Sequence, residues 1–165
     1  MSRKISDLHS SFREKASMFQ RACDEEGLQV LIYCTSRTLA EQARLFRKGR
    51  RFQEIQNKAV ELEKVYKRPD LAKILLNVGP QKSKKIVTWA GPGQSLHNYG
   101  FAFDGCPMEE GKPVWDTKDP EHTAMWLKYG DTAKSFDLIW AGDWPIEKRE
   151  FPHIQQPDLN WRDLI

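Results

Sequence analysis

Apolar side chains recur at intervals of three and four positions near the start of the chain. This spacing places them on one face of an α-helix. Gly27 lies where such a helix would end, because glycine readily adopts the left-handed conformation of a helix C-terminus. The sequence therefore predicts an amphipathic helix over residues 5–26, with its buried face formed by Ile5, Leu8, Phe12, Ala16, Phe19 and Cys23.

A predicted strand and a second helix follow. Residues 28–35, LQVLIYCT, are rich in Val, Ile and Tyr and have the length of a buried strand. Thr38 and Glu41 then have the spacing of a capping box, in which each side chain binds the backbone N–H of the other at the start of a helix. We expect Arg37 at the junction between this strand and this helix.

The middle of the chain has helical periodicity of its own. Two patterns, residues 52–66 and 69–78, are separated by a turn and predict a helical insertion over about 49–80. Residues 79–94 are rich in glycine and proline and predict a loop, with at most a short strand at 86–89.

The last part of the chain predicts further elements of both kinds. A strand is expected after Gly100, a helix over residues 120–136 and another strand over residues 138–142. No repeat or linker divides the chain, so we interpret residues 1–165 as a single domain.

The composition is that of a folded globular protein. Of 165 residues, 39% are hydrophobic and 30% are charged, which excludes a disordered or collagen-like chain. No uncharged apolar run approaches the roughly 20 residues needed to cross a bilayer, so membrane insertion is not expected. The first residues are charged and lack the apolar stretch of a secretory signal, and the cysteine count of 3 is odd, so we expect a reducing cytosolic compartment.

Positive charge is clustered, although the net charge is only +3. Such clusters either attract an anionic polymer, such as nucleic acid or cell wall, or form a solvated helix end and a loop. No zinc-finger spacing or stacking aromatic signature accompanies them, so nucleic acid is not an expected partner. The clusters comprise Arg44, Arg47, Lys48, Arg50 and Arg51, and then Lys82, Lys84 and Lys85.

His97 and Asp104 lie seven residues apart in the stretch SLHNYGFAFD. On one helix or one unbroken strand, their side chains would be too far apart or on opposite sides for a shared ion. Gly100 allows a break, after which a strand would place Asp104 on the side facing His97 and Phe103 in the core. From the residues alone, the two side chains are either metal ligands or a hydrogen-bonded structural pair.

A second cluster, EFPH, places Glu150 three residues before His153. Pro152 keeps the residue before it out of the helical conformation, so this is not a helical HExxH metal motif. Two histidines and one carboxylate leave one position open on a zinc ion, which is the ligand count of a catalytic zinc site. Glu150 would be the base beside a bound water, or else a solvated carboxylate in the charged run EKRE.

These stretches resemble the signature of a known family. SLHNYGFAFD matches the pattern SxHxxGxAxD of the zinc peptidases that share the D-alanyl-D-alanine peptidase and hedgehog fold. AGDW followed by EFPH is similar to their second motif, GxDW…[DE]xPH. TSRTLAEQARLF resembles the family's segment YRSxxEQxxLY, and VTWAGPGQSLHNYG is very similar to the approach loop of phage endolysins in this family. The resemblance covers residues 28–48 and 86–156.

The resemblance implies both a fold and a metal site. The fold would be α+β, of the hedgehog/DD-peptidase type, with an antiparallel sheet that carries the zinc site and helices packed against it. His97, Asp104 and His153 would bind Zn²⁺. Glu150 would be the general base, and Arg37 would bind the substrate and stabilise the oxyanion.

Three further residues have open interpretations. Ser95 would orient the approach loop as part of the substrate-binding site. Gln42 is either a helix-surface residue or a substrate contact. Cys106 lies two residues after Asp104 and is either a thiolate ligand or, as the family pattern favours, a buried bystander.

The resemblance also implies an enzyme that acts on peptidoglycan. We expect zinc-dependent hydrolysis of an amide bond in the stem peptide, by an L-alanyl-D-glutamate endopeptidase or, alternatively, a D-alanyl-D-alanine carboxypeptidase. A non-catalytic zinc-containing wall-binding module is the alternative outside enzymes, and the presence of Glu150 speaks against it. As a phage or prophage endolysin, the protein would be a monomer that stays in the bacterial cytoplasm until a holin gives it access to the wall.

Overall fold

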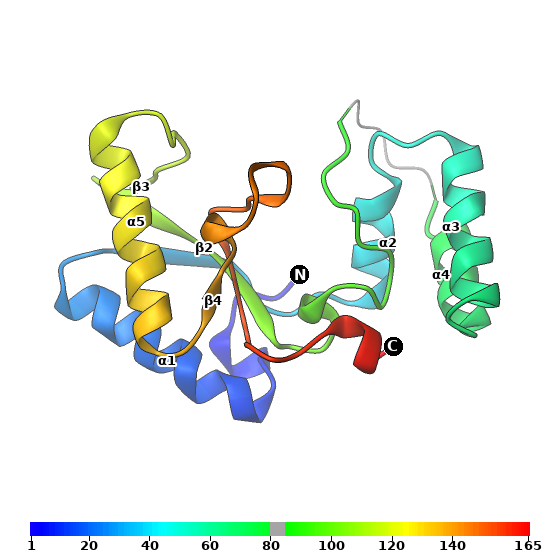
Figure 1. The fold of residues 1–165 in the computed structure, drawn as a ribbon, viewed down its shortest axis with the longest axis horizontal. Coiled ribbons are helices and arrows are strands. Elements are labelled where there is room, and N and C mark those ends of the chain that lie inside the picture. Colours follow the sequence, from blue (N-terminus) through cyan, green and yellow to red (C-terminus); the bar gives the residue numbers. More distant parts are fainter. Residues whose placement is uncertain (80–84) are drawn as a thin grey trace. The chain divides into compact units, whose positions relative to one another are not determined.

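The computed structural model describes residues 1–79 and 85–165 (Figure 1). The chain divides into two compact units. The sheet unit comprises Ser2–Ser36 and Gly100–Asp158, and the helical unit comprises Arg37–Tyr99 and Leu159–Ile165 together with Met1. The predicted insertion at 49–80 belongs to the helical unit. Of the predicted basic clusters, Lys82 and Lys84 lie outside the described residues.

The sheet unit contains a five-stranded sheet in which every pair of neighbouring strands is antiparallel. The strand order is β1-β2-β5-β4, and β3 pairs with β2. The expected antiparallel sheet is therefore confirmed. Its strands are β1 (Val30–Cys34), β2 (Ala102–Glu109), β3 (Lys112–Pro113), β4 (Ile139–Trp140) and β5 (His153–Gln155).

Two long helices, α1 (Ser10–Glu25) and α5 (Pro120–Ser135), contact each other and the sheet (Figure 1). The ring of Phe19 in α1 lies 5.4 Å from that of Phe103 in β2 and 5.3 Å from that of Tyr129 in α5, measured between centroids. All three side chains are fully buried. Because large aromatic side chains remove much apolar area from water, this cluster ties both helices to the sheet.

The first helix begins later than the periodicity predicts. Ile5–Asp7 form a separate 3₁₀ turn, η1, and α1 starts only at Ser10. The reason is a cap, because the His9 side chain accepts a hydrogen bond from the backbone N–H of Ser11. The predicted apolar side chains from Leu8 to Cys23 are nevertheless buried, and Ile5 is partly buried. Gly27 follows the helix with a φ of +73°.

Three helices form the core of the helical unit. Thr38 Oγ1 accepts the backbone N–H of Glu41 at 3.2 Å, and the Glu41 carboxylate accepts that of Thr38 at 3.0 Å, which confirms the capping box. Leu62 and Leu71, one from each helix of the predicted insertion, are fully buried in a cluster with Phe46. The helices are α2 (Leu39–Arg47), α3 (Phe52–Lys64) and α4 (Pro69–Asn77).

Residues 86–89 do not form the short strand that the sequence allowed. The carbonyl oxygen of Thr88 accepts a hydrogen bond from Arg50 Nη2 at 2.7 Å. A strand requires a neighbouring strand for its backbone groups, whereas this carbonyl is bound by a guanidinium.

The first basic cluster is not a uniformly solvated patch. Arg47 is only 8% exposed, and its guanidinium donates to the carbonyl oxygens of Leu75 and Leu76 at 2.8 and 3.0 Å. The Arg50 guanidinium donates to the carbonyl oxygen of Phe46 and lies 3.8 Å from the Phe46 ring centroid. Arg47 and Arg50 therefore cap and cover helices of their own unit, because a buried guanidinium requires such acceptors.

The other regular elements are short. Four more 3₁₀ turns are η2 (Leu96–Asn98), η3 (Ala141–Asp143), η4 (Ile146–Lys148) and η5 (Trp161–Asp163). None of the helices in the described part of the chain has the length and apolar character that crossing a membrane requires.

Candidate metal centre

Three side chains lie in one row across the sheet. Asp104, on β2, is directly opposite Cys34 on β1 and directly opposite His153 on β5. Directly opposed residues of antiparallel strands project from the same face. The sheet therefore presents a thiol, a carboxylate and an imidazole side by side on one face.

A bulge in β1 brings Cys34 to this face. The pairing of β1 with β2 shifts register between Ile32 and Cys34, so Tyr33 is an extra residue. Ile32 is opposite Gly105, where an added Cβ would lie 2.7 Å from the Tyr129 hydroxyl in the core. In a regular strand Cys34 would share the core-facing side of Ile32, because alternate residues point the same way.

The Asp104 and His153 side chains have a geometry that suits a shared ion. His153 Nδ1 lies 3.2 Å from Asp104 Oδ1, and both side chains are largely buried. Two atoms bound to one tetrahedral zinc ion at 2.0–2.1 Å would lie about 3.3 Å apart. The observed distance therefore fits two ligands of one zinc ion without a change of backbone.

Gln155 fixes the orientation of the His153 ring. His153 Nε2 lies 3.1 Å from Gln155 Oε1, which is an acceptor. This contact favours the tautomer with the proton on Nε2, so the lone pair of Nδ1 points toward Asp104. Gln155 was not predicted from the sequence. The signal was its position two residues after His153, since alternate residues of a strand share a face.

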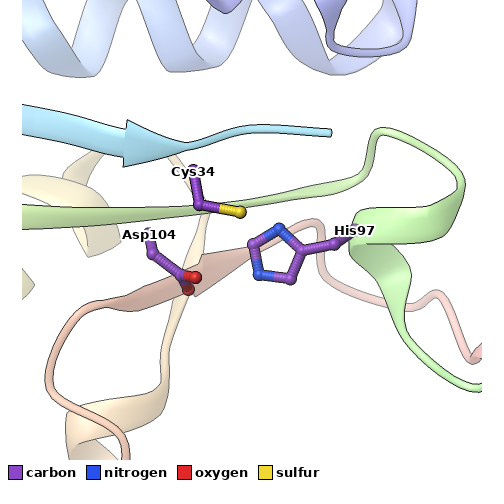
Figure 2. A group of neighbouring side chains, drawn as sticks. All are labelled: Cys34, His97 and Asp104. Atoms are coloured by element: carbon purple, nitrogen blue, oxygen red, sulfur yellow. The ribbon is translucent and has the colours of Figure 1, made fainter. Parts of the chain in front are cut away.

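His97 lies in the 3₁₀ turn η2 and is 2% exposed. Figure 2 shows its side chain together with those of Cys34 and Asp104. The predicted break after the histidine is confirmed, because Gly100 has a φ of +75° and β2 starts two residues later. A side chain at Gly100 would also approach the backbone nitrogen of His9 to 2.7 Å.

Gln42 is fully buried, so of its two interpretations the helix-surface residue is excluded, and its contact with substrate stays a prediction. Its Oε1 accepts a hydrogen bond from Arg37 Nη1 at 2.8 Å, and its Nε2 donates to the carbonyl oxygen of Ala90 at 2.7 Å. The amide thus links the guanidinium to the loop that precedes η2. Burial occurs because the polar face of α2 is covered by this loop, which helical periodicity alone does not indicate.

Backbone and amide contacts hold Arg37 beside η2. The backbone N–H of Arg37 donates to the carbonyl oxygen of His97 at 3.0 Å, and Asn98 Nδ2 donates to the carbonyl oxygen of Arg37 at 2.9 Å. Asn98 Oδ1 also accepts the backbone N–H of Gly93 at 3.0 Å. Asn98 was not singled out from the sequence, since its role depends on contacts between distant segments.

Ser95 is half-buried and immediately precedes η2. Its carbonyl oxygen accepts the backbone N–H of Asn98 at 2.9 Å, which closes the turn that carries His97. Its position in the approach loop is as expected, and its contact with substrate stays a prediction.

Glu150 is exposed in the segment that leads to β5. Its backbone N–H donates to the carbonyl oxygen of Ala141 at 3.1 Å, and its carbonyl oxygen accepts the N–H of His153 at 3.2 Å. Trp140 Nε1 donates to the carbonyl oxygen of Phe151 at 2.7 Å. The backbone of Glu150 is therefore held at both ends while its carboxylate faces solvent.

The indole of Trp140 explains a glycine of the second motif. A Cβ at Gly142 would overlap one end of the Trp140 ring, and a Cβ at Gly130 in α5 would overlap the other. Any larger residue at position 142 must displace the indole or the turn η3. Gly142 is thus required by packing beneath the segment that carries Glu150.

Cys106 lies in the hydrophobic core and is fully buried. Burial raises the pKa of its thiol to about 11, partly offset by a hydrogen bond to the backbone of Val114. Its Sγ lies 3.2 Å from the Val114 carbonyl oxygen. A thiol that keeps its proton is a poor metal ligand, so these contacts agree with the bystander interpretation.

Comparison with known proteins gives a family match over most of the chain. The family model described as VanY: D-alanyl-D-alanine carboxypeptidase matches residues 5–151. The peptidoglycan L-alanyl-D-glutamate endopeptidase CwlK of Bacillus subtilis (strain 168) is 27% identical over 154 residues, which cover 91% of this chain and 74% of that protein.

Solved structures share the fold at low sequence identity. A zinc-bound variant of the vancomycin resistance D,D-pentapeptidase VanY has a TM-score of 0.50 and 17% identity, over 90% of this chain and 72% of that one. The L-Ala D-Glu endopeptidase ChiX of Serratia marcescens has a TM-score of 0.50 and 14% identity, over 97% of this chain and 86% of that one. The LD-carboxypeptidase LdcB has a TM-score of 0.51 and 17% identity, over 94% of this chain and 67% of that one. These likenesses confirm the α+β fold of the DD-peptidase type.

Proposed function

Because the chain belongs to the VanY family of D-alanyl-D-alanine carboxypeptidases, we propose that it is a zinc peptidase of the peptidoglycan stem peptide. The observation that carries the proposal is the pairing of Asp104 with His153, whose facing atoms lie 3.2 Å apart on adjacent strands. This is the separation expected of two ligands of one zinc ion. The match with CwlK supports the bond between L-alanine and D-glutamate as the one that is cleaved.

His97, Asp104 and His153 are the proposed zinc ligands. A neutral imidazole and an ionised carboxylate are common zinc ligands, and a set of three leaves a position for water or substrate. The three side chains are sheltered from solvent, with His97 2% and His153 8% exposed as whole residues. The contact of His153 Nε2 with Gln155 supports this assignment, because ligating histidines usually donate their other ring N–H to a nearby acceptor.

Glu150 and Arg37 are the proposed catalytic residues. A bound zinc ion supplies a water of lowered pKa and polarises the scissile carbonyl. The Glu150 carboxylate accepts the proton of the attacking water and then passes it to the leaving amine. The Arg37 guanidinium, held by Gln42, offsets the negative charge that develops on the carbonyl oxygen. Exposure of Glu150 to solvent supports the first role, since the base must exchange with water and substrate.

The D-alanyl-D-alanine carboxypeptidase activity remains the second candidate, because the matched family carries that description. The two activities cut different bonds of one stem peptide and can be separated by their products. Purified muropeptides are incubated with the zinc-loaded protein and the products are identified by mass spectrometry. We expect a peptide that begins with D-glutamate.

Three other results would each give a definite answer. Release of a single alanine would assign the carboxypeptidase activity instead. Intact muropeptides after incubation with a fully zinc-loaded protein would leave only a wall-binding module. Cleavage that persists after removal of the metal by a chelator would contradict a zinc peptidase of either kind.

We further propose that the protein acts as a phage or prophage endolysin. The similarity of the loop VTWAGPGQSLHNYG to the approach loop of phage endolysins supports this role. In that role the protein would accumulate in the bacterial cytoplasm, and a holin would be needed for its access to the wall.

Replacement of Gln42 by alanine is expected to lower kcat/KM by about tenfold or more while zinc content is unchanged. The buried amide holds the Arg37 guanidinium, and a hydrogen bond to a charged group contributes about 1.5–3 kcal/mol. Steady-state kinetics on a muropeptide and metal analysis of the same sample measure both quantities. Gln53→Ala is the matched control, since this amide lies on the exposed face of α3 and contacts Asn57. Equal kinetics for the two variants would contradict a positioning role for Gln42.

A further inference from the structure

We propose that Cys34 is a further metal ligand, which adds a thiolate to the imidazole and carboxylate ligands. The inference rests on the proposed function only in requiring that a metal is bound at this face of the sheet. It assigns to this chain a mixed sulfur, nitrogen and oxygen site.

The position of Cys34 carries the inference. Cys34 and His153 flank Asp104 on the two neighbouring strands, so all three point from one face. Figure 2 shows the Cys34 thiol and the Asp104 carboxylate, which extend from these neighbouring strands.

The spacing of Cys34 and Asp104 suits two ligands of one ion. Zinc binds sulfur at about 2.3 Å and nitrogen or oxygen at about 2.0–2.2 Å, so ligand atoms on one tetrahedral ion lie about 3.3–3.6 Å apart. Directly opposed residues of antiparallel strands have Cβ atoms about 4.5–5.5 Å apart, so rotation of the Cys34 and Asp104 side chains can bring their ligand atoms to this separation. No shift of strand register is required.

The Tyr33 bulge gives the cysteine its orientation. Between Val30 and Cys34, the described pairing of β1 with β2 shifts register once, at Tyr33. Without it, Cys34 would point with Ile32 toward the core and away from Asp104. Bulges commonly redirect a side chain next to a functional site.

The other two cysteines have a different environment. Cys23 and Cys106 belong to the hydrophobic core cluster. Cys34 is equally buried, yet it does not belong to that cluster and lies directly opposite Asp104, which is itself directly opposite His153. Its surroundings are those of a metal ligand rather than of a core side chain.

A thiolate would change the metal preference of the site. Soft sulfur ligands favour Zn²⁺ and Cd²⁺, whereas a site of carboxylate and imidazole binds harder ions comparatively better. Zinc can expand from four to five ligands, so coordination by Cys34 is compatible with a catalytic role. Removal of the sulfur should therefore lower the affinity for Cd²⁺ more than that for Co²⁺.

The test uses the full chain loaded with Co²⁺ in place of zinc. A cobalt ion bound to a thiolate has a charge-transfer absorption in the near ultraviolet, in addition to the visible bands that any low-symmetry cobalt site shows. We expect the charge-transfer absorption in the unmodified protein and in Cys106→Ala. We expect its loss in Cys34→Ala and Cys34→Ser, with the visible bands retained. The ratio of Cd²⁺ to Co²⁺ affinity should fall at least tenfold in both Cys34 variants.

The outcomes separate this inference from the proposed function. Visible cobalt bands without charge-transfer absorption in the unmodified protein would overturn the Cys34 assignment and leave the zinc peptidase intact. Failure of the unmodified protein to bind Co²⁺ or Zn²⁺ would overturn both. Two Cys34 variants are used because serine preserves size and a polar atom if alanine disturbs folding, and circular dichroism checks the fold of each. Unchanged charge-transfer absorption in folded Cys34→Ser would also contradict the assignment.

Discussion

Replacement of His153 by alanine is expected to remove stoichiometric zinc and to abolish hydrolysis of muropeptides. His153 Nδ1 faces Asp104 Oδ1 at 3.2 Å, and the variant removes this nitrogen from the proposed ligand set. A catalytic zinc site held by three protein ligands loses most of its affinity when one is removed, because the ion must then take a solvent ligand in its place. His97→Ala is expected to behave in the same way. Metal analysis after extensive dialysis and product formation measure the two effects.

His122→Ala is the matched control for these histidine variants. His122 lies in α5, where its Nε2 contacts the Glu109 carboxylate at 3.2 Å. This variant should keep its zinc and its activity, since no role in metal binding is assigned to this ring. Full zinc stoichiometry in His97→Ala or His153→Ala would refute the ligand assignment.

Replacement of Glu150 by glutamine should lower the hydrolytic rate by about a hundredfold or more and leave the zinc content unchanged. An amide has nearly the shape of the carboxylate but cannot accept the proton of the attacking water. The contacts that hold the residue are made by its backbone, with Ala141 and His153, and these do not depend on the side chain. Single-turnover kinetics on a soluble muropeptide would isolate the chemical step from product release.

Glu147→Gln provides the comparison for this change. Glu147 is an exposed carboxylate of the same charged run, located in η4. The two variants lose the same charge, so a general electrostatic effect would appear in both. A similar, small loss in each would show that Glu150 is a solvated surface carboxylate, which the sequence alone also allowed.

Much of the fold follows from local patterns. The apolar spacing of the first helix, the capping box at Thr38 and the break at Gly100 each depend on residues close together in the chain, and the structure confirms all three. Strand β4, Ile139–Trp140, lies within the strand expected over residues 138–142 but is shorter than expected. Strand β5 has three residues, too few to show an alternating pattern, and it depends on pairing with distant strands, as does the Tyr33 bulge, so the sequence did not indicate either.

The site could be predicted only where its residues form a recognisable motif. The metal ligands and Glu150 were assigned from such motifs and remain predictions to be tested by the variants above. Cys34 is placed by its pairing partner Asp104, and Gln155 shares a face with His153 only because residues 153–155 form a strand, which the sequence did not indicate. The burial of Arg47 likewise depends on the carbonyl groups of a helix 28 residues away in the chain.

The fit of Trp140 against two glycines has a consequence for genetic screens. Substitutions at Gly130 or Gly142 would displace the indole that holds the Phe151 carbonyl, and the segment carrying Glu150 would shift with it. A selection for cells that survive expression of the protein together with a holin would therefore recover changes at these glycines beside changes at the ligands. Such variants would be inactive although every group that touches metal or substrate is intact, and a map of lost activity would extend beneath the site into α5.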